Sequence, residues 1–139
     1  MKKPKEFLAL GLMSGTSADG IDIALIKTDG KKKINLVSSN YHSFSKQFTE
    51  KIKQSFTKKI NQNKRKQKKI FDLGQEFTNL NINLINKFLQ KNKIKKEDIN
   101  VIGFHGQTIC HNPRQRYSVQ IGDAQKLANS LRIKVVSNF

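Results

Sequence analysis

The sequence is poor in several residue types, and each shortage limits what the chain can be. It has one cysteine, two prolines and no tryptophan among 139 residues. A single cysteine excludes an internal disulfide and is typical of a reducing compartment. No apolar run approaches the roughly 20 residues of a membrane span. The short apolar stretch after the basic N-terminus is better explained as a buried strand than as a signal peptide. We therefore expect a cytoplasmic protein without a membrane partner.

Acidic residues are also scarce. There are 10 Asp and Glu against 27 Lys and Arg, and the net charge is +17. Such an excess favours nonspecific attraction to nucleic acid. The lysines are spread through every segment, however, which favours a solvated basic surface over a specific nucleic-acid site. The length suits one domain with a core and is too short for two ordinary domains.

Apolar runs in the first third of the chain predict three strands. The runs cover residues 7–13 and 21–27, and a third segment rich in Val, Ser, Tyr and Phe covers 34–44. The turn signal Asp29-Gly30 separates the second run from the third. Because the connections are short, we expect three consecutive antiparallel strands.

The hydrophobic period then changes to that of helices. Apolar residues four apart over 48–60 indicate one helix. A basic segment covers 58–69, and a longer amphipathic helix is predicted over 71–89, with Phe71 and Phe77 on its core face.

The last third alternates strands with a helix. The pattern predicts strands over 101–104 and 117–121 and a final strand over 133–136. Between them it predicts a helix over 124–131 with Asp123 as its N-cap. The whole order is β-β-β-α-α-β-β-α-β. It predicts an α/β fold of ribonuclease H-like type, with a mixed sheet and helices on its faces.

The segment "GLMSGTSADGID" at 11–22 contains an unusual concentration of small polar groups. Glycines allow a close backbone approach to a ligand, and successive exposed amides form an anion site. Ser14, Thr16 and Ser17 add hydroxyl donors, while Asp19 and Asp22 could position a hydrated Mg²⁺ ion. No Lys follows the glycines as in a Walker A motif. These residues alone leave two alternatives open, a polyphosphate site and a Gly/Ser-rich turn.

Four segments in the same order, "GLMSGTSADGID", "GFHGQTICHNP", "VQIGDAQKLA" and "VVSNF", resemble the anhydro-N-acetylmuramic acid kinases. The resemblance covers nearly the whole chain and is weakest over 45–70. It implies an ATP-dependent, two-lobed sugar kinase. Such an enzyme opens the 1,6-anhydro ring with water and phosphorylates O6, in the recycling of cell-wall sugars. The positions matching the family's ATP-phosphate loop are Gly15, Thr16, Ser17, Ala18, Asp19, Gly20, Ile21 and Asp22.

A second polar group follows the strand over 101–104. The end of a strand is where α/β sheets commonly place ligands. We therefore expect four residues to contact the sugar or to shape its pocket: His105, Gln107, Thr108 and Gln120. The alternative is that the His and the Gln brace the neighbouring loop. The spacing of His105, Cys110 and His111 matches no standard zinc pattern, and nothing marks a base that would activate Cys110.

The resemblance also implies what is missing from these residues. In the family, the water-activating Asp, the adenosine-binding loops and the second lobe follow the "VV..F" strand. We therefore expect residues 1–139 to be an incomplete first lobe without a catalytic residue and without kinase activity alone. The full-length form is expected to be a homodimer.

Two other functions compete with a kinase. A basic nucleic-acid-binding module would use the 58–69 segment as a phosphate footprint, but that segment contains no aromatic residue. A nuclease on the same fold would need clustered carboxylates on strands. Asp19 and Asp22 are the candidates for such a cluster.

Overall fold

A computed structural model describes residues 6–56 and 63–139. Its main element is a five-stranded sheet with the order β3-β2-β1-β4-β7. The first three strands pair antiparallel, while β4 runs parallel to β1 and β7 parallel to β4. This arrangement confirms the predicted mixed sheet. The strands are β1 (Phe7–Met13), β2 (Gly20–Thr28), β3 (Ile34–Ser43), β4 (Val101–Phe104) and β7 (Val135–Val136).

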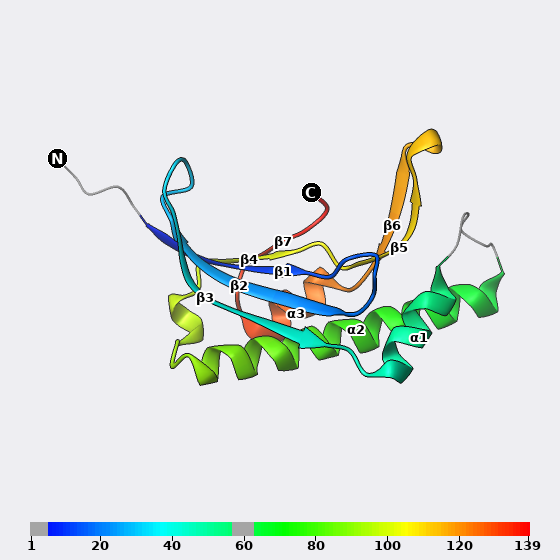
Figure 1. The fold of residues 1–139 in the computed structure, drawn as a ribbon, viewed down its shortest axis with the longest axis horizontal. Coiled ribbons are helices and arrows are strands. Elements are labelled where there is room, and N and C mark those ends of the chain that lie inside the picture. The colour runs from blue at the N-terminus through cyan, green and yellow to red at the C-terminus, as the bar shows by residue number, and fades with distance from the viewer. Residues whose placement is uncertain (1–5, 57–62) are drawn as a thin grey trace.

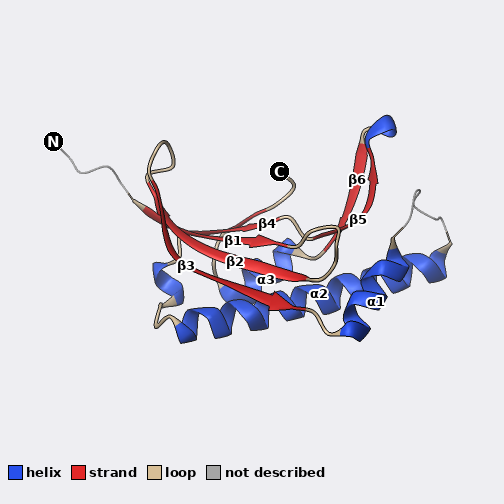
Figure 2. Ribbon diagram, in the orientation of Figure 1, coloured by secondary structure: helices blue, strands red, loops and turns tan. Residues whose placement is uncertain are grey.

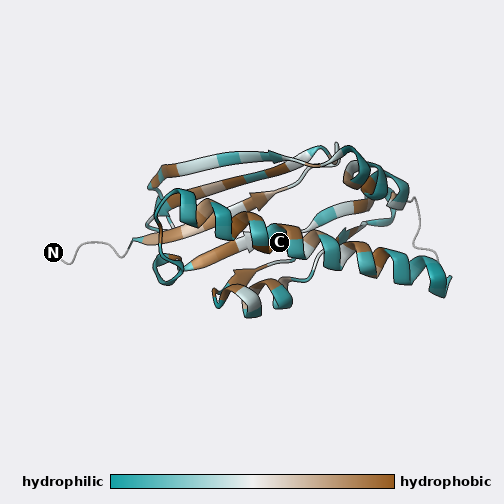
Figure 3. Cartoon of the chain, turned by 90° about the horizontal axis from the view of Figure 1, so that it is seen from below, coloured by the Kyte–Doolittle hydropathy of each residue, from teal (hydrophilic) through white to brown (hydrophobic). Residues whose placement is uncertain are grey.

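The α-helices of the described ranges lie on one face of this sheet (Figure 1). They are α1 (Lys46–Ser55), α2 (Lys64–Lys91) and α3 (Ala124–Leu131). Alternate strand residues, such as Leu10, Ile23 and Ile102, are buried against them, and the helices turn hydrophilic residues outward (Figure 3). The sequence predicts helices on the faces of the sheet, and the described part of the chain places α1 to α3 on a single face.

Two further strands form a hairpin that stands apart from the sheet (Figure 2). β5 (Gln107–Asn112) pairs antiparallel with β6 (Tyr117–Ile121), and the short 3₁₀ helix η2 (Pro113–Gln115) closes the tip. The strand over 117–121 is predicted correctly. Its partner β5 is not predicted, because its polar residues give no apolar alternation. Another 3₁₀ turn, η1 (Lys96–Asp98), precedes β4.

Helix α2 begins earlier than its apolar pattern predicts. Asn63 caps it, with Oδ1 accepting from Arg65 N at 2.9 Å, so the basic residues 64–69 form its first turns. The prediction that Phe71 faces the core is wrong, since its side chain is 64% exposed. This end of α2 extends past the sheet (Figure 1), whereas Phe77 is buried and stacks on Phe104.

The first predicted helix ends earlier in the structure than its apolar pattern over 48–60 indicates. α1 ends at Ser55, and Phe56 is 39% exposed. The predicted continuation to residue 60, and Lys58 and Lys59 of the basic segment, lie outside the described residues. The final strand is also reduced, to Val135–Val136. Within 6–56 and 63–139, none of the helices has the length and apolar character needed to cross a bilayer.

Candidate functional site

The 14–19 loop joins β1 to β2 in a tight turn. The turn is closed by the Ala18 N–H, which donates to the Gly15 carbonyl oxygen at 3.1 Å. Ala18 has a left-handed φ of 53° and is fully buried. With Ala18 pointing inward, Thr16, Ser17 and Asp19 are exposed. The loop therefore presents hydroxyls and a carboxylate to solvent.

The two carboxylates of the segment both lie within electrostatic range of Tyr41. Asp19 Oδ1 accepts from Ser17 Oγ at 2.7 Å, and exposed Asp22 is paired with Tyr41 across the β2–β3 ladder. Burial and then the charges of Asp19 and Asp22 raise the pKa of Tyr41. Tyr41 thus belongs to this acidic edge, which sequence reasoning missed because the strand register was not known.

The inner side of the loop is held by residues from the turn between β4 and β5. The Ser14 N–H donates to His105 Nε2 at 3.3 Å. Ser14 Oγ lies 2.5 Å from Gln107 Oε1 and 3.0 Å from the Gly20 carbonyl oxygen. Because the hydroxyl has one hydrogen, it can donate to one of these two oxygens at a time. Gln107 Nε2 donates to the carbonyl oxygens of Gly15 at 3.0 Å and of Thr108 at 3.2 Å.

These contacts define the role of Gln107. Its side chain is fully buried, and both amide hydrogens are used within the protein. Of the two alternatives, sugar contact and bracing of the loop, the geometry favours bracing. His105 is partly buried, and this burial lowers its pKa. A neutral imidazole suits the contact with Ser14, because Nε2 must accept there.

Packing alone requires a glycine at position 20. A Cβ added there would collide with the His42 carbonyl oxygen and the Tyr41 ring. Ile21 is fully buried as well. Of the eight predicted loop positions, Ala18, Gly20 and Ile21 therefore shape the site from inside. The positions that reach the surface are Gly15, Thr16, Ser17, Asp19 and Asp22.

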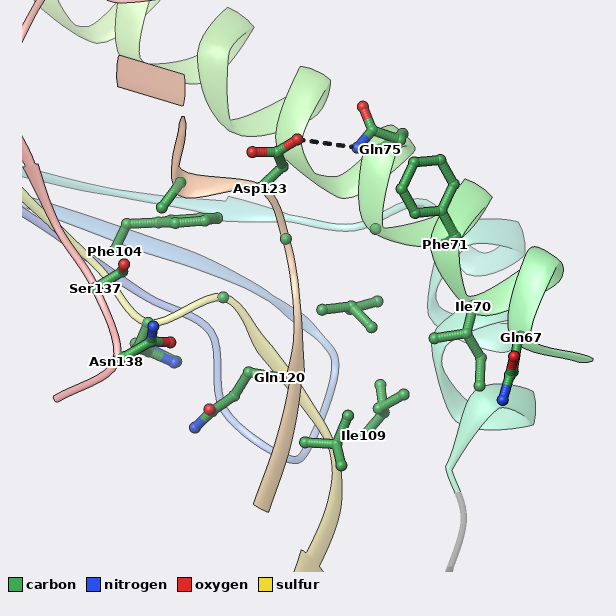
Figure 4. A pocket seen from close by; sticks show the side chains of 17 residues that line it. Gln67, Ile70, Phe71, Gln75, Phe104, Ile109, Gln120, Asp123, Ser137 and Asn138 are labelled. Atoms are coloured by element: carbon green, nitrogen blue, oxygen red, sulfur yellow. Dashed lines mark hydrogen bonds between the residues drawn. The ribbon is translucent and has the colours of Figure 1, made fainter. Parts of the chain in front are cut away.

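A cavity of about 560 Å³ lies between the β5–β6 hairpin, α2 and the start of α3 (Figure 4), and it includes His105, the partner of the loop residue Ser14. Of the four residues expected at the sugar site, His105 and Gln120 are among its lining residues, whereas Gln107 and Thr108 are not. Gly106 makes the turn beside His105. Its φ is +77°, and an added Cβ would collide with the Ile121 carbonyl oxygen, so this turn has no room for a side chain.

The opposite wall combines apolar and polar groups. On this wall, Phe71 comes from α2. Asn138 lines the cavity on the side that faces Phe71 (Figure 4). Asp123 caps α3 by accepting from the Lys126 N–H at 2.8 Å, which lowers the pKa of the Asp123 carboxyl. Its Oδ2 also accepts from Gln75 Nε2 at 3.2 Å. The capping motif identified Asp123 as a helix start, but no linear signal places these residues around one cavity.

Cys110 and His111 have different surroundings. Cys110 is buried, and His111 Nδ1 lies 2.7 Å from Ser118 Oγ. Over the described ranges, no group of three or more His, Cys, Asp or Glu is arranged to hold a metal ion.

Comparison with known proteins supports the resemblance found in the motifs. A family model described as "Anhydro-N-acetylmuramic acid kinase" matches residues 7–139. Curated proteins of that name are 39% identical in Zymomonas mobilis, over 95% of this chain, and 38% identical in Bradyrhizobium diazoefficiens, over 94%. The matched part is 37% and 36% of those relatives, respectively. The chain thus spans about a third of their length.

Proposed function

Because the chain belongs to the anhydro-N-acetylmuramic acid kinase family, we propose that it carries the phosphate loop and one wall of the sugar site of such an enzyme. The reaction is that of an ATP-dependent kinase acting on 1,6-anhydro-N-acetylmuramic acid. Water opens the anhydro ring and O6 receives the γ-phosphoryl group, which gives N-acetylmuramic acid 6-phosphate and ADP. The observation that carries this proposal is that His105 both contacts the 14–19 loop and lines the neighbouring cavity.

The loop has the groups that a polyphosphate needs. Phosphoryl transfer depends mainly on positioning and on stabilising negative charge. Thr16 and Ser17 offer exposed hydroxyls, and Gly15 leaves space above the backbone, since an added Cβ would meet Ser17 Oγ at an ordinary 3.6 Å. Asp19 and Asp22 are oxygen ligands of the kind that suits hydrated Mg²⁺. Bound Mg²⁺ would neutralise part of the phosphate charge.

The cavity has the size and lining expected for a monosaccharide. A site of about 560 Å³ lies within the usual range for small ligands. His105 and Gln120 are placed to bond hydroxyl or acetamido groups, and Phe71 offers an apolar surface to the carbon skeleton. Gln107 and Thr108 shape this pocket from behind. We place the activity in the cytoplasm, in the recycling of cell-wall sugars.

We further propose that these 139 residues do not complete the reaction alone. Water attack needs an available carboxylate aligned with the sugar and the γ-phosphate. Among the described residues that line the cavity, Asp123 is the one carboxylate, and it is engaged as a helix cap. The purified chain should bind ATP with Mg²⁺ in a calorimetric titration but form no sugar 6-phosphate. Absence of ATP binding would contradict the phosphate-loop assignment, and product formation would contradict the proposed inactivity.

One observation favours a second candidate, a basic nucleic-acid-binding module. Phe56 and Phe71 are exposed near the basic first turns of α2, and aromatic residues beside lysines suit single-stranded nucleic acid. Affinity for an oligonucleotide that survives at 200 mM salt and depends on its sequence would support this function. We expect weak, salt-sensitive binding without sequence preference.

A further inference from the structure

The 14–19 loop is connected to the cavity by a short chain of hydrogen bonds. His105 contributes Nε2 to the Ser14 N–H, and Gln107 bonds Ser14 Oγ and the Gly15 carbonyl oxygen. We call these contacts of His105 and Gln107 with Ser14 and Gly15 the brace. The brace joins residues more than 90 positions apart in the sequence. It is the point where the loop and the cavity wall meet.

The two bracing side chains differ in what they face. Gln107 is fully buried and contacts protein groups, while His105 is partly buried and lines the cavity. The turn between them contains Gly106, whose left-handed φ and close approach to the Ile121 carbonyl oxygen leave no room for a Cβ. A shift of the His105 ring acts on Ser14 directly, and Gln107 connects Ser14 to the Gly15 carbonyl oxygen.

We propose that His105 and Gln107 are positioning residues that couple occupancy of the cavity to the conformation of the 14–19 loop. A ligand that fixes the His105 ring holds the Ser14 N–H in place. The loop is then ordered before a phosphate group arrives, and its groups lose less conformational freedom on binding. By thermodynamic linkage, a phosphate ligand on the loop must strengthen binding in the cavity by the same factor. This inference rests on the proposed kinase function, since it takes the two ligands to be a sugar and ATP.

The coupling is measured by titrating the chain with ATP and Mg²⁺, with and without saturating 1,6-anhydro-N-acetylmuramic acid. In the unsubstituted chain, the sugar should tighten ATP binding by roughly fivefold or more. Gln107→Met keeps the length of the side chain and removes its hydrogen bonds. In this variant the ratio of ATP affinities with and without the sugar should fall at least about twofold below that of the unsubstituted chain, and the part that remains is carried by the contact of His105 with the Ser14 N–H. The matched control is Gln125→Met, at an exposed glutamine of α3 whose amide bonds Asn129, and here the ratio should be unchanged.

A purely structural role would give a different result. Loss of packing at Gln107 would weaken ATP and sugar binding separately but leave their ratio as in the unsubstituted chain, and that result would overturn the proposal. A ratio of one in the unsubstituted chain would overturn it as well. If Gln107→Met does not fold, Ser14→Ala removes the bond between Ser14 Oγ and Gln107 with little change in volume, and the same loss of coupling is expected.

Hydrogen exchange separates failure of this proposal from failure of the proposed function, because it needs no nucleotide. Adding the sugar should slow exchange of the 14–19 amides in the unsubstituted chain and in Gln125→Met, whereas in Gln107→Met the slowing should be confined to Ser14, whose N–H still contacts His105. Failure to bind ATP would count against the kinase function, whereas slowed exchange would still support the brace. Equal exchange with and without bound sugar in all three proteins would overturn the brace.

Discussion

The 14–19 loop and the basic first turns of α2, residues 64–69, are two places where this chain could hold phosphate, and they are built in opposite ways. The loop carries neutral donors and the carboxylate of Asp19, with Asp22 following in β2, and buried Gln107 holds it from behind through Ser14. The α2 turns carry four Lys and one Arg, all exposed on an end of the helix that extends past the sheet (Figure 1). Fixed geometry selects one ligand, whereas a dense set of exposed charges attracts any polyanion. This contrast supports our proposal that the 14–19 loop is the specific phosphate site.

Replacing Gly20 should have the largest effect on this contrast, because it removes the support of the loop. In Gly20→Val, the added side chain would collide with the Tyr41 ring and the His42 backbone. Overpacking of this kind costs about 3 kcal/mol of folding free energy. The urea midpoint should fall clearly below that of the unsubstituted chain. An unchanged midpoint would show that β3 moves away without cost, and that Gly20 is not needed for packing.

The next effect is expected at the exposed edge of the loop. Asp19→Ala removes a carboxylate that accepts from Ser17 Oγ and, like Asp22, acts electrostatically on Tyr41. Without this Mg²⁺ partner, the affinity for ATP in Mg²⁺ should fall roughly tenfold, with little change in stability because Asp19 is exposed. Glu97→Ala, in the exposed η1 turn, is the control. Equal ATP affinities in the two variants would remove Asp19 from the site.

These two effects also show how far the sequence predicts the site. The apolar runs correctly predict β1, β2 and β4, and the turn residues mark the loop between the first two. The role of Gly20 was not predictable, because it depends on Tyr41 and His42 in β3 and thus on strand register.

The role of Gln107 illustrates a second limit. A sequence window around it shows a polar residue after a strand, which suits a ligand contact as well as a brace. The decision between them comes from contacts with Ser14 and Gly15, 93 and 92 positions away. The start of α2 was missed for another reason: lysines are good helix formers, but they give no apolar period to detect.

A smaller effect is expected when charge is removed from the α2 region. Lys66→Gln with Lys69→Gln removes two exposed positive charges near Phe56. If these lysines contact only phosphates, oligonucleotide affinity should fall for all sequences alike, and the slope of log affinity against log salt should become shallower by about two. ATP affinity at the loop should be unchanged. A loss confined to one oligonucleotide sequence would instead favour specific recognition at α2.

The smallest effect on stability is expected at Gly15, which lies in the same loop as Gly20 but has space around it. A Cβ at Gly15 would lie 3.6 Å from Ser17 Oγ, an ordinary contact, and Gly15 is not among the glycines with positive φ. Gly15→Ala should therefore change the free energy of unfolding, measured by urea denaturation, by less than about 0.5 kcal/mol. If phosphate approaches the loop backbone at this position, the added methyl group should still weaken ATP binding, because it occupies space that the ligand needs. Weakened ATP binding at unchanged stability would identify Gly15 as a glycine kept for the ligand, in contrast to Gly20, which is kept for the fold. If ATP affinity is also unchanged, the phosphate does not approach the loop at Gly15, and the exposed side chains of Thr16, Ser17 and Asp19 would have to supply the contacts.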